Sequence, residues 1–367
     1  MRLTVRRKVS QLVNSPVLRL CAGLVLTYCA RNYQPTQKVP SRKYVEHSSH
    51  TSARLLDQVD VVLVSGTLSC TIEEVVRSHK RFLQGLRHIY IVLPVAHMQE
   101  CTSVFNTRDE LISAHSVSCV SEVSVLKFES LNFQKNALGW QARSDRRHWY
   151  YQQLLKLTAF MNIHGLTEDF LIWDADNILL KPFSPKHEQK VRFLTRTENQ
   201  NTKKCVNATD WTDKQIEKYV YWPATKELLS HGSFSTVDVR RASRPDIVVH
   251  QMLFNQRTLR ALLIHICDLE QGNATLTPTQ CSNNILSSIP RNASNRKAFS
   301  EYHLYFTWFV MTSDMYFIDC IPYQRFLSGL HCTKLESTLT RLREERLSYA
   351  VVETRSYDYS SVHAAQT

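Results

Sequence analysis

The chain has 367 residues, 43% hydrophobic and 21% charged, a composition typical of a globular protein with a sizeable core. It has only 8 glycines and no GxGxxG or GxxxxGK motif, which excludes a glycine-rich nucleotide loop of either kind. The formal charge is +12, but residues 1–54 carry +9 of it, so we expect no nucleic-acid-binding face on the rest of the chain.

Residues 1–54 are predicted to form a basic N-terminal arm. Arg6, Arg7 and Lys8 precede an apolar segment whose uninterrupted part is residues 20–30. Eleven residues are too few for a spanning helix, which needs about 20, but are enough for a signal peptide core. We therefore expect a cleaved signal or a short anchor with a polar stem, and a type II Golgi membrane protein facing the lumen. A mitochondrial presequence or a disordered basic tail is the alternative.

Glycosylation motifs and cysteines agree with a secretory location. Sequons begin at Asn207, Asn273 and Asn292, all in polar segments typical of loops. None of the ten cysteines forms a CxxC pair, which disfavours a zinc site or a redox motif. They are either small buried hydrophobic residues or disulfide partners, and proximity in sequence makes Cys320/Cys332 and Cys267/Cys281 the candidate pairs.

The first part of the main region predicts a β–α–β unit. Residues 59–65 form a β-branched run before Gly66, residues 70–86 have apolar residues at helical spacing, and residues 88–94 form a second apolar run that ends at Pro94. Such a unit implies parallel strands joined by a right-handed crossover.

Three further elements lead to a pair of acids. Residues 123–131 are predicted to be a third strand, residues 148–166 an amphipathic helix, and residues 169–173 a strand. Asp174 and Asp176 follow this last strand directly. The carboxyl ends of strands in an open α/β sheet are where ligands bind.

The two acids suit a divalent cation. Two carboxylates one residue apart can turn toward one ion, and oxygen ligands suit Mn²⁺ or Mg²⁺. Such an ion can neutralise a departing diphosphate. The alternative is a solvated turn in which Asp only forms local hydrogen bonds.

The Asp-x-Asp triplet followed by ILLKPF resembles the metal-binding motif of GT-A glycosyltransferases. Together with YQQLLKL (151–157), VHQMLF (249–254) and FSEYHLY (299–305), it resembles a little-characterised, mostly microbial family of nucleotide-diphospho-sugar-transferase-like proteins. The resemblance spans about residues 59–309 and departs from the family at His148 and Phe306, where glycine is expected.

The resemblance implies a single α/β domain of GT-A type, with a Rossmann-like mixed sheet flanked by helices. We place this domain at residues 55–333. It is preceded by the arm, 1–54, and followed by a C-terminal helix and polar tail, 334–367.

The resemblance also implies roles at the donor site. Asp174 and Asp176 would bind the metal and, through it, the diphosphate of a UDP- or GDP-sugar, with Asp176 also serving catalysis. Ser65 and Thr67 would line the nucleotide. Gln152 and Lys156 share a helix face, and Lys156 would contact a phosphate. Besides the two acids, the implied donor-site residues are thus Ser65, Thr67, Gln152 and Lys156.

On the acceptor side, Glu301 would bind the acceptor or act as general base in an inverting displacement. His250 or His303 would supply a third metal ligand. The acceptor would be a hydroxyl of a glycan or glycoconjugate.

Two other functions are compatible with the pattern. WDADNILL also resembles the first motif of haloacid-dehalogenase-type phosphatases, with Asp174 as nucleophile and Asp314 and Asp319 as a late acidic pair. Against it, that motif usually opens a domain, and Asn177 and Ile178 stand where Gly and Thr are usual. The second alternative is an inactive GT-A fold that binds carbohydrate.

Overall fold

The computed structural model describes most of the main region, and all described residues lie within Leu55–Thr367. None of the helices in this described part is long and apolar enough to cross a membrane. The predicted arm and all three sequons lie outside it. The described residues are 58–106, 117–127, 144–195, 212–230, 234–243, 247, 250–267, 277–288, 299–320, 323–326, 332–345 and 347–352.

The core is a mixed five-stranded sheet with the order β3-β2-β1-β4-β8. Its first four strands are parallel, and β8 is antiparallel to β4. The α/β class with a mixed sheet flanked by helices is thus confirmed. The strands are β1 (Val59–Val64), β2 (Leu86–Leu93), β3 (Val117–Ser121), β4 (Asp169–Asp174) and β8 (Gln251–Asn255).

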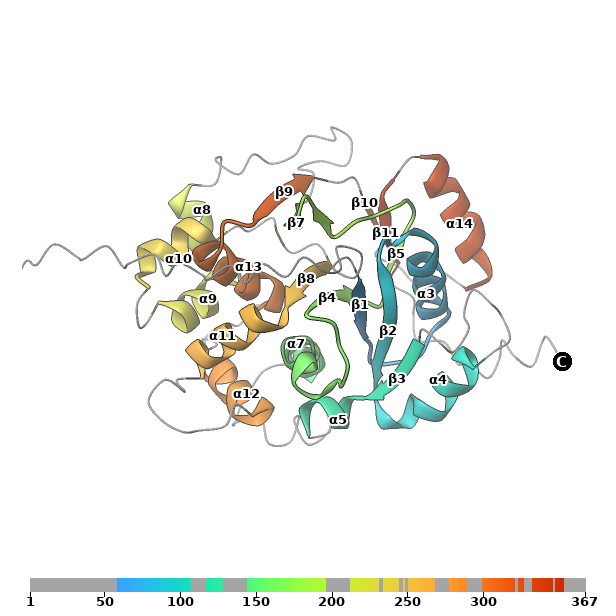
Figure 1. The fold of residues 1–367 in the computed structure, drawn as a ribbon, viewed down its shortest axis with the longest axis horizontal. Coiled ribbons are helices and arrows are strands. Elements are labelled where there is room, and N and C mark those ends of the chain that lie inside the picture. Colours follow the sequence, from blue (N-terminus) through green and yellow to red (C-terminus); the bar gives the residue numbers. More distant parts are fainter. Residues whose placement is uncertain are drawn as a thin grey trace, which may run out of the picture. The chain divides into compact units, whose positions relative to one another are not determined.

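Two helices on opposite sides of this sheet connect its parallel strands (Figure 1). Helix α3 (Cys70–Phe82) joins β1 to β2, and helix α7 (Ser144–Asn162) precedes β4. The strand order runs from β1 outward to β3, and the chain then returns to place β4 on the other side of β1. Because both crossovers are right-handed, this reversal puts the two helices on opposite faces of the sheet. Such a reversal creates a crevice at the strand ends.

The predicted third strand, residues 123–131, is wrong. The strand is β3, six residues earlier, and residues 122–126 form helix α5 (Glu122–Leu126). Ser121 caps this helix by accepting a hydrogen bond from the Val123 amide, and Lys127 ends it in the left-handed region with φ 65°. Val125 and Leu126, two of the apolar residues that suggested a strand, are buried from a helix instead, an ambiguity typical of short apolar runs.

Helix α7 is buried on nearly every side rather than amphipathic. From Tyr150 to Phe160 all residues but one are buried, including Gln153, Lys156 and Thr158. Polar groups inside a protein must find partners, so these side chains are expected to make specific contacts.

The C-terminal region contributes a strand to the fold as well as the predicted helix, and residues 353–367 of the predicted tail lie outside the described residues. The predicted helix is present as α14 (Cys332–Glu344), but β11 (Tyr349–Val352) is the middle strand of a second sheet, between β10 (Tyr323–Phe326) and β5 (Asn177–Leu179). A third sheet has the order β6-β7-β9, with β6 at Lys186–His187, β7 at Lys190–Thr195 and β9 at Tyr316–Cys320.

The remaining helices cover the β8 side of the sheet and the edges (Figure 1). They are η1 (Val95–His97), α4 (Met98–Phe105), α8 (Asp213–Glu217), α9 (Trp222–Leu229), α10 (Thr236–Ala242), α11 (Gln256–Ile266), α12 (Pro278–Ser287) and α13 (Glu301–Thr312).

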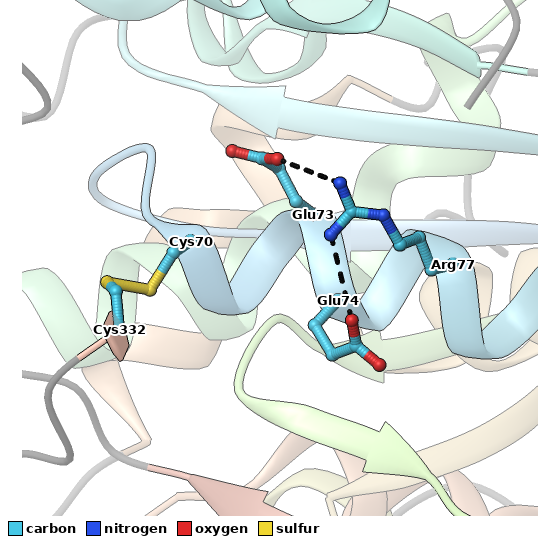
Figure 2. The surroundings of a disulfide bond; sticks show 5 residues. All are labelled: Cys70, Glu73, Glu74, Arg77 and Cys332. Carbon is cyan, nitrogen blue, oxygen red and sulfur yellow. Dashed lines mark hydrogen bonds and ion pairs between the residues drawn. A yellow bond between two sulfur atoms is a disulfide. The ribbon is translucent and has the colours of Figure 1, made fainter. Parts of the chain in front are cut away.

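Three disulfides join described residues. Cys267–Cys281 is one of the predicted pairs, and it is confirmed. The predicted Cys320–Cys332 pair is wrong, because Cys332 bonds to Cys70, 262 positions away (Figure 2). The fold brings the start of α14 to the start of α3, which proximity in sequence could not indicate. The third bond is Cys101–Cys119.

Candidate metal centre

The backbone at the end of β4 brings three chain segments together. Asp174 is the last residue of β4 and is paired with Val64, the last residue of β1. Its amide donates to the carbonyl of His250, at 2.9 Å, immediately before β8 begins. His250 has a φ of 69°, a left-handed conformation that a histidine adopts rarely and that turns the chain into β8.

Asp174, Asp176 and His250 form a candidate metal centre at this point. Each offers one ligand atom, and these atoms all lie within 4.8 Å of one another. His250 Nδ1 is 2.9 Å from Asp174 Oδ2. All three side chains are half-buried, so the group is accessible from one side. Two carboxylate oxygens and one imidazole nitrogen are a donor set that fits a divalent cation of the Mn²⁺ type.

Lys156 contacts this group through Asp174 and is itself buried. Its Nζ is 2.5 Å from Asp174 Oδ1 and 2.8 Å from Glu301 Oε1, and the residue is only 4% exposed. Burial would lower the pKa of Lys156, but the two carboxylates raise it above its ordinary value, so the ammonium stays charged. The ammonium thus contacts two carboxylates of the protein, and the predicted contact of Lys156 with a phosphate stays a prediction.

Glu301 is also enclosed. It is the first residue of α13, is 0% exposed and accepts from Lys156. The amide of Gln153 faces it, and its nitrogen, in the orientation that satisfies both groups, lies 3.0 Å from Glu301 Oε1. Burial raises the pKa of Glu301, Lys156 opposes the rise, and Asp174 adds to it. Glu301 thus holds Lys156 in place in the structure, and its predicted contact with an acceptor stays a prediction.

Tyr302 and Gln153 belong to the site but were not predicted. Tyr302 Oη donates to Asp174 Oδ1 at 2.8 Å, and the Lys156 ammonium lies 4.8 Å from the centre of its ring. Burial, together with Asp174, raises the pKa of Tyr302 well above 10, which keeps the hydroxyl protonated as a donor. Gln153 follows the predicted Gln152, and Tyr302 follows the predicted Glu301. The sequence analysis therefore identified both segments but not these two residues.

These contacts fix the charge and direction of Asp174. Burial would raise its pKa, but Lys156 and His250 hold the pKa of Asp174 well below its ordinary value. Lys156 and Tyr302 both bind Oδ1, so Oδ2 is the oxygen that faces His250. The buried cluster thus holds an ionised carboxylate in one orientation, as a preorganised metal ligand requires.

The other candidate ligand, His303, is not in the group. Its ring lies on the far side of α13, where Nδ1 is 2.8 Å from the Thr225 hydroxyl of α9. Burial lowers the pKa of His303 to about 3, so the ring is neutral. Consecutive residues of a helix point about 100° apart, which explains why Tyr302 faces Asp174 and His303 does not.

The two histidines give a matched pair of variants. We expect His250→Ala to weaken Mn²⁺ binding about 10- to 100-fold, because it removes one of three ligands, and His303→Ala to leave Mn²⁺ binding unchanged while lowering stability. Titration of each purified variant with Mn²⁺ measures this difference. Equal losses in both variants would remove His250 from the site.

The predicted nucleotide residues lie at the neighbouring strand end. Ser65 follows β1, and its hydroxyl donates to the Thr67 carbonyl at 2.8 Å. Gly66 and Thr67 are exposed and form a turn with Ser65. A Cβ added to Gly66 would lie 3.9 Å from Gln152 Nε2 of α7, so Gln152 borders the same turn. These three predicted residues are thus placed around one accessible turn beside Asp174.

The phosphatase alternative needs a late acid next to Asp174. Asp319 instead lies on β9 in a different sheet, and its carboxylate binds Arg192 of β7, with Arg192 Nε 2.9 Å from Oδ2. It is not a member of the Asp174 group. The arrangement therefore disfavours that chemistry.

Comparison with known proteins gives distant similarities in fold. Mouse xyloside xylosyltransferase 1 in its apo form superposes with a TM-score of 0.40 and 8% identity, over 80% of this chain and 97% of that chain. The galactosyltransferase LgtC, with donor and acceptor sugar analogues, has a TM-score of 0.37 and 8% identity, over 84% of this chain and 93% of that chain. The Q189E active-site mutant of LgtC gives 0.39 and 8%, with the same coverage.

No curated protein matches the sequence. One family model does match, over residues 72–322, which include α3, the Asp-x-Asp triplet, His250 and Glu301. This span is more than half of the chain, so the protein belongs to the family described as "Family of unknown function (DUF6492)".

Proposed function

We propose that this protein is a metal-dependent glycosyltransferase that moves a sugar from a nucleotide-diphosphate donor to a hydroxyl of a glycan or glycoconjugate. The observation that carries the proposal is the group of Asp174, Asp176 and His250 at the carboxyl ends of β1 and β4. Ligands bind at such strand ends in open α/β sheets, and the exposed turn at Ser65–Thr67 would face the nucleotide.

The charges around the site support a cation there. Asp174 and Asp176 place two carboxylates at the site, and Lys156 contacts Asp174 and Glu301. The two carboxylates would attract a divalent ion. A bound metal would supply charge neutralisation for a departing nucleoside diphosphate.

The ligand types favour Mn²⁺ over Mg²⁺. Mg²⁺ prefers an all-oxygen shell and keeps most of its water, whereas imidazole is a better ligand for transition metals. Asp174, Asp176 and His250 would hold the ion, and the remaining positions would stay open for water and donor oxygens.

The chain's other residues have roles that need no contact with the reacting atoms. Lys156 and Tyr302 hold Asp174 Oδ1, and Glu301 with Gln153 holds Lys156. Ser65, Thr67 and Gln152 would face the nucleotide.

We also propose that the protein works in the secretory lumen, in the Golgi. Three disulfides between described residues support an oxidising compartment, since such bonds are rare in reducing ones. The basic, partly apolar N-terminal segment supports the same location and would anchor the protein to the membrane unless it is cleaved as a signal.

A thermal-shift panel tests the proposed function. UDP- and GDP-sugars are added with and without Mn²⁺, and Asp176→Asn is the control variant. We expect one donor at about 100 times its Kd to stabilise the wild type by about 2.7 kcal/mol only when Mn²⁺ is present, and not to stabilise the variant. Stabilisation by Mg²⁺ with fluoroberyllate, and none by any nucleotide sugar, would favour a phosphatase instead.

A further inference from the structure

The C-terminal region reaches the candidate metal centre through strand β11. The Val352 amide donates to the Asp176 carbonyl at 2.7 Å, and Val351 pairs with Asn177 in antiparallel register. All four residues of β11 are buried. The chain immediately after the second acid is thus held by residues that lie beyond the end of the family match at residue 322.

Strand β5 depends on this contact. It has three residues, Asn177–Leu179, and lies at the edge of its sheet with β11 as its one strand neighbour in the described part of the chain. On its other side, the Ser78 hydroxyl of α3 accepts from the Leu179 amide at 3.2 Å, and the Trp173 indole donates to the Asn177 carbonyl at 2.5 Å. A strand this short has little order without its partner, so β11 sets the path of Asp176 and Asn177.

Helix α14 fixes β11 to α3 at two points. The Cys70–Cys332 disulfide joins the first residue of α14 to the first residue of α3 (Figure 2). Near the end of α14, Arg343 Nη2 lies 3.4 Å from Oε1 of Glu74, which Figure 2 also shows. Between these points α14 buries Leu335, Leu339 and Leu342.

The same disulfide lies close in sequence to the exposed turn. Cys70 is three residues after Thr67, so it fixes the end of the segment that begins at Ser65. One covalent bond therefore connects the proposed nucleotide turn to the segment that carries β11.

We propose that Cys332–Val352, anchored by the Cys70–Cys332 disulfide, is a positioning element that orders Asp176 for metal binding. The metal part rests on the proposed function, whereas the ordering of residues 174–177 does not. Asp176 is the ligand affected because its own carbonyl accepts the bond from β11. The neighbouring ligand Asp174 is held independently by Lys156 and Tyr302.

Hydrogen–deuterium exchange, combined with Mn²⁺ titration, tests this proposal on the full chain. The double variant Cys70→Ser/Cys332→Ser removes the anchor without leaving a free thiol of the pair, and Cys101→Ser/Cys119→Ser removes a disulfide between α4 and β3 as the matched control. Val352→Pro removes the amide that binds Asp176, and Val352→Ala keeps it while shortening the side chain.

We expect peptides that contain residues 174–177 to exchange several-fold to about tenfold faster in Cys70→Ser/Cys332→Ser and in Val352→Pro, with Mn²⁺ affinity falling by a similar factor. Exchange in these peptides and Mn²⁺ affinity should stay near wild type in both controls. Arg343→Gln, a milder change at the other anchor, should give a smaller effect in the same direction if a stronger variant does not fold.

The outcomes separate the two proposals. Unchanged exchange at residues 174–177 in the anchor variants and in Val352→Pro overturns the positioning role, whatever the metal result. Faster exchange with wild-type Mn²⁺ affinity overturns its importance for the metal. Faster exchange in a protein whose wild type binds no Mn²⁺ keeps the positioning role and overturns the proposed function.

Discussion

Asp176→Asn is expected to reduce Mn²⁺-dependent hydrolysis of a nucleotide-sugar donor by about 10²- to 10³-fold or more, while the protein keeps its fold. The substitution keeps the size of the side chain but removes the charge with which Asp176 would bind the cation. Asp176 is half-buried and the substitution keeps its size, so we expect the free energy of unfolding to change by less than about 1 kcal/mol.

The control for this prediction is Asp314→Asn, at an exposed acid that the phosphatase alternative would use. It should leave donor hydrolysis unchanged. Release of the nucleotide, measured with and without Mn²⁺, gives the rates. Full activity of Asp176→Asn would remove the second acid from the mechanism.

Lys156→Met is expected to destabilise the protein by about 3–5 kcal/mol at pH 7, the cost typical of removing one partner from a buried ion pair. The change leaves Asp174 and Glu301 inside the protein without the cation that both contact. The expected loss of stability is much larger than that from removing a surface lysine, which is within about 0.5 kcal/mol. Urea unfolding under non-reducing conditions measures it.

Glu301→Gln is the matched variant, because it removes the charge at 301 but keeps an oxygen that can accept from Lys156. Its cost should be smaller, about 1–3 kcal/mol. The double variant should cost less than the sum of the two, since the residues are in contact. If Lys156→Met unfolds within about 1 kcal/mol of the wild type, Lys156 does not compensate these two carboxylates.

The features predicted correctly depend on local sequence. The β–α–β unit and the strand before Asp174 are short apolar runs bounded by Gly66, Pro94 and the acids, and these patterns survive in the structure. Asp174 and Asp176 converge because β4 ends at Asp174, which frees the chain to turn. The left-handed backbone of His250 brings the third ligand to the same point.

The features missed depend on packing between distant segments. The burial of Lys156 could not be predicted because α7 is covered on nearly all sides, which its own periodicity did not indicate. Glu301 is buried against that lysine, which lies 145 positions away in the sequence. Likewise, β11 joins Asp176 and Asn177 only because α14 returns to α3, and the sequence near Tyr349 contains no sign of this pairing.

The central claim is that one divalent cation binds to Asp174, Asp176 and His250, and anomalous diffraction from crystals grown with Mn²⁺ and UDP or GDP tests it most directly. The account predicts one strong anomalous peak about 2 Å from an oxygen of each aspartate and from a ring nitrogen of His250, with diphosphate oxygens completing the shell. A nucleotide bound without an ion at these residues, or an ion bound elsewhere with the diphosphate, would contradict it.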